Sequence, residues 1–445
     1  MLLLFSFTFN LLPLFLSIGG WVKSQQNVDR GSIISAIFLV AGTCIGGGML
    51  ALPVATGVSG FLPSIAMMAV CWLAMTLTAL LLLEVSLWME EGVHIISMTS
   101  RILGLPGKIV SWCLYLFICY ASLVAYTAAG GMQLAAGVSD YFGIILHKDV
   151  GALLFILIFG AAVYFGSHVV GRVNAILFTA MIAAYFALVG MGIPEMKSEL
   201  LFNHRWSGSL MAIPLLLTAF SFQTMVPSLT PYLKKNMRAM RIAVIGGTTV
   251  ALSIYAIWQL LILGIVPVEG PKGLAEALMK GVPSTQFLRE HVEGRWIVSI
   301  AEYFAFFAIV TSFLGISLGL FDFLSDGLKI KKQGYGNLTL GALIIFPTLI
   351  FATKFERAFL VALETSGGFG DSILNGLMPV IMVWLGRYRL GLHKEGFYLP
   401  GGKPMLIVIF AFFLFTLILE ILMQTGQMAS TYEPFEVPVH NTLEI

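Results

Sequence analysis

Long apolar runs separated by short polar or glycine- and proline-rich interruptions dominate the chain from residue 31 onward. A helix needs about 20 apolar residues to cross a bilayer. The pattern therefore predicts eleven membrane-spanning helices, at residues 31–57, 61–89, 108–137, 151–168, 173–193, 209–231, 241–266, 296–324, 338–353, 358–386 and 404–425. The expected architecture is that of an all-α polytopic membrane protein.

The composition supports this prediction and excludes most other classes of protein. Hydrophobic residues make up 58% of the 445 residues and charged residues 11%, against about 45–50% and about 25% in soluble domains. A net charge of +2, with the basic residues in short loops, argues against nucleic acid as a partner. The four cysteines all lie inside apolar runs, which predicts small buried side chains rather than a disulfide or metal framework: Cys44, Cys71, Cys113 and Cys119.

The distribution of basic residues sets the expected orientation. If residue 30 is cytoplasmic, sixteen of the 25 lysines and arginines face the cytoplasm, as the positive-inside rule requires. The acidic tail, residues 431–445, then faces outward. Residues 1–27 are an apolar extension without the basic start and small-residue cleavage site of a signal peptide. These residues could form a twelfth span or an interfacial segment, or could result from a misassigned start codon.

Two interruptions within apolar runs lie half a protein apart. The first span contains three consecutive glycines, Gly46 to Gly48, each of which costs a helix interior about 1 kcal/mol relative to alanine. The sixth span contains Ser221, Gln223 and Thr224 shortly before a proline. This offset indicates two five-helix halves that each open with a discontinuous helix, and an odd number of helices per half gives them opposite topology. Inverted repeats of this kind are typical of secondary transporters.

Broken helices inside a membrane have a specific chemistry. Unpaired backbone groups cost several kcal/mol each in hydrocarbon, so unwound backbone is tolerated only where protein or a water-filled cavity supplies partners. A half-helix N-terminus suits a carboxylate, and freed carbonyls suit a cation or an ammonium group. Together they predict a site for a zwitterion. The alternative is that the glycines only permit close helix packing, as in the small-residue pair of Gly42 and Gly46.

Four segments carry a family resemblance. They are VAGTCIGGGMLALP (Val40–Pro53), LLLLEVSLWM (Leu80–Met89), AFSFQTMVPSLTPYL (Ala219–Leu233) and TSFLGISLGLFDFLSDGL (Thr311–Leu328). In this order they resemble the bacterial hydroxy and aromatic amino acid permease family, and most of all its tyrosine-specific members of the chlamydial type. The resemblance covers about residues 28–425.

The resemblance implies a fold and a function. The fold is the five-plus-five inverted repeat of the leucine-transporter type, with a discontinuous first and sixth helix and an eleventh helix. It forms one domain, residues 28–430, with repeats at 31–193 and 207–386 and the last helix at 404–425. The function is cation-coupled import of an aromatic amino acid, tyrosine favoured, across the bacterial inner membrane. No enzyme activity, no cofactor besides the coupling ion and no obligate protein partner are expected.

Carried over position by position, the resemblance also implies binding residues. The backbone from Thr43 through Gly46, Gly47 and Gly48 would hold the substrate carboxylate. The stretch Ser221 to Thr224, with Gln223, would face the ammonium group and the side chain. Tyr120 or Tyr126 of the third span would line the pocket, although a spacing of six does not place both on one face. Stacking on an aromatic substrate is expected of two further rings, for which core packing is an equally good interpretation: Phe220 and Phe222.

The coupling ion is sodium or a proton. In this fold a cation site joins carbonyls of the first helix, near Ala41 and Cys44, to hydroxyls of the eighth, and Thr311 and Ser312 stand at the matching place as sodium ligands. Proton-coupled relatives carry a lysine in the fifth helix, where this chain has Met181. The alternative for the two hydroxyls is that they bond only to their own helix.

Several acidic residues lie outside this scheme. Four carboxylates lie within or near spans and are functional candidates by default, with the first two as proton carriers if sodium fails: Glu84, Glu302, Glu364 and Glu420. Asp322 and Asp326 lie beside three lysines, which predicts a solvated ion-pair cluster. A symporter or exchanger for another neutral amino acid, and a membrane-embedded transferase, are the alternative functions.

Overall fold

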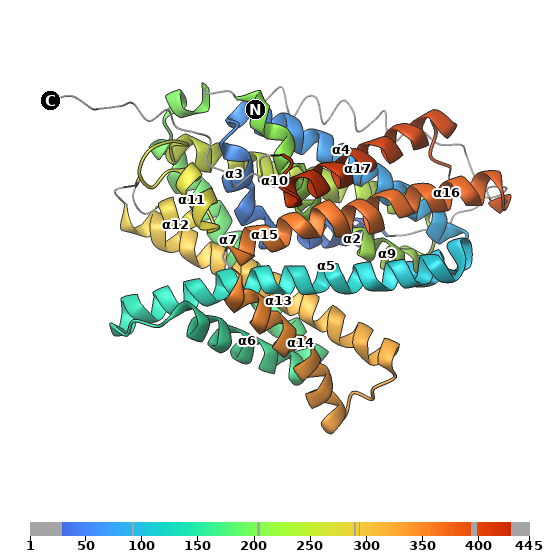
Figure 1. Cartoon of the computed structure of the whole chain (residues 1–445), viewed down its shortest axis with the longest axis horizontal. Helices are drawn as coiled ribbons and strands as arrows, with labels where there is room; N and C mark the ends of the chain where they lie inside the picture. The colour runs from blue at the N-terminus through green and yellow to red at the C-terminus, as the bar shows by residue number, and fades with distance from the viewer. Residues whose placement is uncertain are drawn as a thin grey trace.

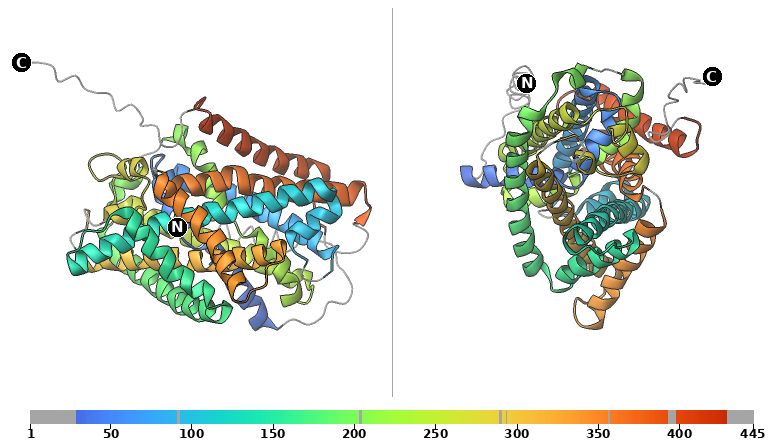
Figure 2. Two further views of the ribbon diagram at one scale, coloured as in Figure 1. Left: turned by 60° about the horizontal axis from the view of Figure 1, so that its bottom comes forward. Right: turned by 90° about the vertical axis from the view of Figure 1, so that its left-hand side faces the viewer.

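The structure is a computed structural model that describes residues 29–90, 93–202, 205–288, 291–292, 294–355, 357–392 and 398–428. The expectations for residues 1–27 and for the tail at 431–445 fall outside these residues. Within the described residues the secondary structure is helical throughout, with no strand. Most of the long helices run along one common direction (Figures 1 and 2).

The first half of the chain begins with a broken helix. Its two parts are α2 (Arg30–Cys44) and α3 (Gly48–Gly57), which meet at an angle of 56°. Four further helices follow, α4 (Phe61–Leu87), α5 (Ile95–Phe142), α6 (Lys148–Tyr164) and α7 (Ser167–Gly192). The break lies at the predicted glycines, where helix propensity is lowest.

The second half repeats this plan. After the short turns η1 (Ile193–Glu195), η2 (Ser198–Phe202) and η3 (Trp206–Ala212) comes a second broken helix, made of α8 (Ile213–Ala219), η4 (Gln223–Met225) and α9 (Val226–Tyr232). Then come α10 (Met237–Ile265), α13 (Arg295–Leu328), α14 (Tyr335–Lys354) and the continuous run of α15 (Ala358–Thr365), the π-helical η5 (Ser366–Leu377) and α16 (Met378–Tyr388). The loop before α13 carries α11 (Leu274–Lys280) and α12 (Thr285–Leu288), and the chain continues into α17 (Gly402–Gln424).

The packing of the two halves is reciprocal. Helix α10 packs against α2, and its counterpart α4 packs against α8 and α9. Helix α13 packs along α7, and its counterpart α5 packs against α15 and η5. Figure 1 shows α6 and α14, the fourth helix of each half, side by side beneath α5 and α13. If each helix is replaced by its counterpart in the other half, these contacts turn into one another, as an inverted repeat requires.

The span prediction agrees with the structure apart from the bounds of several helices. Among the described residues, nine helices are long and apolar enough to cross a membrane, and the bent pair of α2 and α3 makes a tenth. Helix α6 occupies the place of the fourth predicted span, and its 17 residues match the shortest spanning helices. The predicted third span is the later part of the longer α5, which kinks at Gly104, where φ is 71°, a conformation that glycine adopts without steric cost.

Burial differs sharply between the two parts of the first broken helix. All ten residues of α3 are buried, and α11 of the loop packs against α3. Helix α2, by contrast, leaves Ile34, Phe38 and Leu39 exposed. Helix α3 is thus enclosed by the protein, whereas part of α2 lies at its surface.

Candidate functional site

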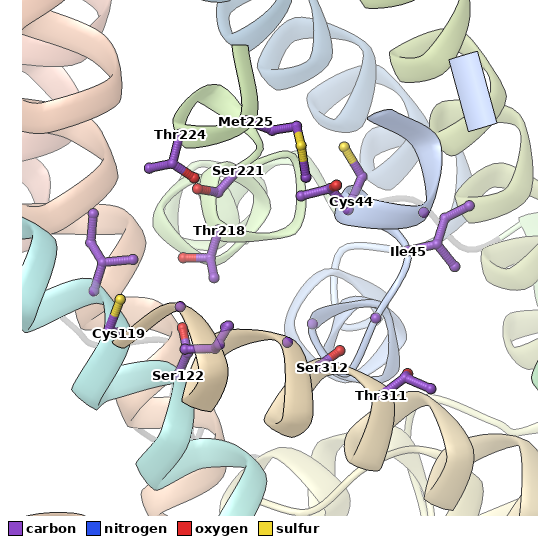
Figure 3. A pocket seen from close by; sticks show the side chains of 18 of the residues that line it. Cys44, Ile45, Cys119, Ser122, Thr218, Ser221, Thr224, Met225, Thr311 and Ser312 are labelled. Atoms are coloured by element: carbon purple, nitrogen blue, oxygen red, sulfur yellow. The ribbon is translucent and has the colours of Figure 1, made fainter. Parts of the chain in front are cut away.

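A cavity of about 510 Å³ lies where the two broken helices meet, within the range of about 300–1,000 Å³ typical of small-molecule sites. Figure 3 shows its walls: the end of α2, the α8 break, α5 and α13. The described lining is apolar with scattered hydroxyl groups, one carboxylate and no basic side chain. Its polar members are Thr43, Tyr115, Ser122, Tyr126, Asn174, Thr218, Ser221, Thr224, Thr311, Ser312 and Asp371.

The first break presents backbone to this cavity through Gly46 and Gly48. The N–H of Gly47 donates to Ser312 Oγ on α13 at 3.0 Å, which fixes the unwound segment. Among the described residues, no hydrogen bond involves the N–H of Gly46 or Gly48. These two donors match the expected carboxylate cradle, whereas the Thr43 hydroxyl donates to Leu39 O of its own helix.

The second break runs from Phe220 to Phe222 and is stabilised by hydrogen bonds to the Gln223 side chain. Phe222 N–H donates to Gln223 Oε1, and the Gln223 amide donates to Met75 O on α4 at 3.1 Å. Gln223 is fully buried and does not line the cavity. Its side chain instead links the break to α4 through these hydrogen bonds. Ser221 lines the cavity, as the sequence led us to expect.

Tyr255 of α10 joins the two breaks. Its buried hydroxyl lies 2.5 Å from the carbonyl oxygen of Cys44 and 2.7 Å from that of Ala219. Cys44 ends α2, and Ala219 ends α8. The carbonyl groups that the two breaks leave without helical partners thus share the Tyr255 hydroxyl as hydrogen-bond donor. This reduces the free-energy cost of placing them in the membrane interior.

The candidate aromatic residues separate into two groups. Tyr126 lines the cavity, and its ring lies against Gly47. Tyr120 does not line the cavity: its hydroxyl donates to Leu343 O on α14 at 2.8 Å. Phe220 and Phe222 are fully buried outside the lining, and Phe220 makes an edge contact with Tyr255. Of these four residues, the structure brings only Tyr126 to the site.

Asp371 is a site residue that the sequence analysis missed. It lies in η5, is fully buried and lines the cavity. Its carboxylate lies 2.6 Å from Ser221 Oγ, 2.6 Å from Asn375 Nδ2 and 3.2 Å from Thr218 Oγ1. The available signal was a charged residue in mid-span, at GGFGDSIL, which marks functional sites in membranes.

The expected cation ligands lie near one another but have other partners. Thr311 Oγ1 donates to Phe307 O at 2.8 Å, within its own helix, and Ser312 Oγ accepts the Gly47 N–H. Ala41 O accepts from Ile45 N at 2.9 Å, and Cys44 O is bound by the Tyr255 hydroxyl. Cys44, Thr311 and Ser312 line the cavity, whereas Ala41 lines a neighbouring apolar one between α2, α7 and α10.

Comparison with known proteins identifies the family. The sequence model of the tryptophan/tyrosine permease family matches the chain over residues 29–420. The chain belongs to this family. The permease is 31% identical to tyrosine-specific transport system 1 of Haemophilus influenzae, over 84% of this chain and 93% of the relative. It is 27% identical to a tryptophan-specific transport protein of Pseudomonas aeruginosa, over 87% and 94%. It is accordingly a membrane transporter and not an enzyme.

Solved structures similar to this permease establish the fold. MhsT in complex with L-phenylalanine matches with a TM-score of 0.58 and 14% identity, over 91% of this chain and 100% of that one. Mhp1, a nucleobase-cation-symport-1 family transporter, matches with a TM-score of 0.57 and 15% identity, over 88% and 92%. The predicted inverted repeat of the leucine-transporter type is therefore confirmed.

The acidic candidates of the permease have roles outside the cavity. Glu84 is fully buried on α4 and forms a salt bridge with Arg387 of α16. Glu84 also accepts from Leu399 N, and Arg387 donates to Leu399 O. A carboxylate with so many fixed partners is suited to holding α4 and α16 together.

The other three acidic candidates, Glu302, Glu364 and Glu420, do not line the cavity either. Glu364 of α15 and Glu420 of α17 are buried, and Glu302 of α13 is half-buried. Asp322 forms the expected surface ion pair, with Lys332 at 2.8 Å.

One expectation about the cysteines is wrong. Cys113 is exposed on the outer surface of α5, whereas Cys44, Cys71 and Cys119 are buried as predicted, and all four are free thiols.

Proposed function

We propose that this permease imports an aromatic amino acid, tyrosine first, by cation-coupled symport with alternating access. The observation that carries the proposal is that both helix breaks open onto one cavity. The free N–H groups of Gly46 and Gly48 suit the substrate carboxylate. No hydrogen bond among the described residues uses the carbonyl of Ser221, which lines the cavity and suits the ammonium group.

The remaining wall suits an aromatic side chain. Tyr126, Ile118 and Phe178 give apolar and ring surface, and Ser122 and Thr218 give hydroxyl groups within the same lining. A phenol needs both kinds of contact, because its ring prefers apolar surface and its hydroxyl loses a hydrogen bond when buried without a partner. This combination supports tyrosine above phenylalanine.

The burial contrast within the first broken helix supports an inward-open state. With residue 30 cytoplasmic, α2 is the inner half of that helix and α3 the outer half. The cavity extends beside the exposed residues Phe38 and Leu39 of α2, whereas α3 is sealed under α11. The permease then lies in the bacterial inner membrane, with the acidic tail, residues 431–445, in the periplasm.

Uptake of labelled tyrosine into proteoliposomes tests the substrate assignment. We expect unlabelled tyrosine, tryptophan and phenylalanine to compete best among the twenty amino acids. If leucine or lysine competes best, the permease is a symporter or exchanger for another neutral or basic amino acid. Heat-inactivated protein reconstituted in the same lipid is the control for passive entry.

The coupling cation is tested by replacing Na⁺ with choline at fixed pH. Loss of uptake assigns sodium, for which Thr311 and Ser312 are the proposed ligands. Full uptake without sodium, with collapse on adding a protonophore, assigns the proton.

A further inference from the structure

Asp371 has an asymmetric set of hydrogen-bond partners. Its Oδ1 atom lies 2.6 Å from Ser221 Oγ and 2.6 Å from Asn375 Nδ2, both of which donate to it. The second Asn375 amide proton is directed to Ser221 Oγ at 3.1 Å, so this hydroxyl keeps its own proton for Oδ1. One oxygen of the carboxylate is therefore fully supplied with donors.

The other oxygen lacks a committed donor. Oδ2 lies 3.2 Å from Thr218 Oγ1, but that hydroxyl also lies 2.7 Å from the carbonyl oxygen of Leu363. A threonine hydroxyl has one proton, and Leu363 O, which can only accept, is the nearer acceptor. A proton on Oδ2 would complete the arrangement, because Asp371 would then donate to Thr218 Oγ1, and Thr218 to Leu363 O.

The charges around Asp371 do not neutralise it. The described lining of the cavity holds no basic side chain. Of the elements packed against η5, α5 contributes Tyr115, Cys119 and Tyr126 to the same lining, α15 contributes Glu364, and α17 contributes Glu420 against Gly368. The Arg387 guanidinium of α16 is committed to Glu84 of α4. A buried carboxylate without a countercharge is costly, so a proton is favoured at this position.

We propose that Asp371 is the proton-carrying group of this permease and that one proton crosses with each substrate molecule. The inference rests on the proposed function. In the outward-open state an O–H bond forms between a proton from the external water and Oδ2, which makes Asp371 neutral. In the inward-open state, the cavity that Asp371 lines leads out beside α2, and the proton leaves along it for cytoplasmic water.

The position of Asp371 links its proton to the helix break. Ser221 stands at the α8 break, and Thr218 lies in the last turn of α8. Loss of the proton places a negative charge beside two hydroxyl groups of this broken helix, which changes the stability of the break. Proton binding and the movement of α8 are therefore coupled through direct contacts.

The wild-type permease provides the first test. Proteoliposomes filled with a pH-sensitive dye should acidify when external tyrosine is added in choline buffer, by one proton per tyrosine taken up. Tyrosine influx without acidification, or influx that requires Na⁺, would overturn the proton assignment and leave the proposed function intact. Absence of flux for every amino acid would instead contradict the proposed function.

The substitution Asp371→Asn provides the second test. It preserves size and removes the titratable proton. We expect the accumulation of tyrosine driven by an inward proton gradient to fall at least tenfold, while counterflow of labelled against unlabelled tyrosine persists and no longer varies with pH. Size-exclusion profile and melting temperature establish that the variant is folded.

Two outcomes of this test contradict the proposal. Gradient-driven accumulation at the wild-type level would show that the proton binds elsewhere. A folded variant that no longer binds tyrosine would make Asp371 a substrate ligand. The matched control is Glu420→Gln, another buried carboxyl group that contacts η5 outside the cavity. It is expected to keep accumulation and proton influx.

Discussion

The hydroxyl group of Tyr255 lies 2.5 Å from the carbonyl oxygen of Cys44 and thereby ties the break in the first helix to α10. The same hydroxyl lies 2.7 Å from Ala219 O at the second break. The phenol has one proton, so two carbonyl groups that are 175 residues apart in sequence, as the numbers 44 and 219 give, share a single donor. A movement of either break therefore changes the hydrogen bonding of the other.

Replacing Tyr255 by phenylalanine should weaken the permease in two ways. The change leaves two buried carbonyl oxygens without their partner, which costs about 1–3 kcal/mol of stability, and it uncouples the two breaks. We expect a lower melting temperature in detergent and a tyrosine uptake rate reduced at least fivefold. Tyr335→Phe, at an exposed position on α14, is the control. A Tyr255→Phe variant with normal uptake would contradict a role in coupling.

The two neighbouring glycines of the first break should respond differently to alanine. A Cβ atom on Gly47 would lie 2.5 Å from the ring of Tyr126, whereas one on Gly48 would meet Ala219 Cα at 3.7 Å, an ordinary contact. We expect Gly47→Ala to reduce tyrosine uptake at least tenfold and Gly48→Ala to reduce it less than threefold. Initial uptake rates, normalised to the amount of protein in the membrane, measure the difference. Equal losses in both variants would mean that flexibility, and not contact with Tyr126, is what matters.

Breaking the buried salt bridge should destabilise the fold without acting on the site. Glu84→Gln leaves the Arg387 charge unpaired in the interior. Such a change typically lowers the free energy of unfolding by about 3–5 kcal/mol. The double variant Glu84→Met, Arg387→Met should recover part of that loss, because no charge is left buried. Full recovery is not expected, since the Leu399 backbone groups lose their partners. Thermal unfolding of the purified variants measures this, and an unchanged melting temperature in Glu84→Gln would argue against the bridge.

Single cysteines should report the open side of the cavity. In a background with all four native cysteines replaced by alanine, we expect Thr43→Cys to react with a membrane-impermeant thiol reagent from the cytoplasmic side of inverted vesicles. Tyrosine should slow the reaction, because residue 43 lines the cavity. Thr56→Cys, in the buried α3, should stay unreactive under the same conditions. Labelling of residue 43 only from the periplasmic side would reverse the orientation.

The sequence by itself determined the membrane class, the order of the helices and the position of both breaks. These properties follow from local physics. Apolar runs of about 20 residues leave no alternative in a bilayer, and three consecutive glycines weaken a helix wherever it packs. The offset between the two breaks also predicted the repeat, which the reciprocal contacts of α10 with α2 and of α4 with α8 display.

Only the tertiary structure decided which side chains face the substrate cavity. Tyr120 and Tyr126 are chemically equivalent in the sequence, yet one contacts α14 and the other Gly47. Glu84 and Asp371 are both acids in spans, but Arg387 neutralises the first, from a position 303 residues away, whereas the second meets only uncharged hydroxyl and amide groups. Partners at such separations are set by how helices pack against one another, and no local pattern encodes that packing.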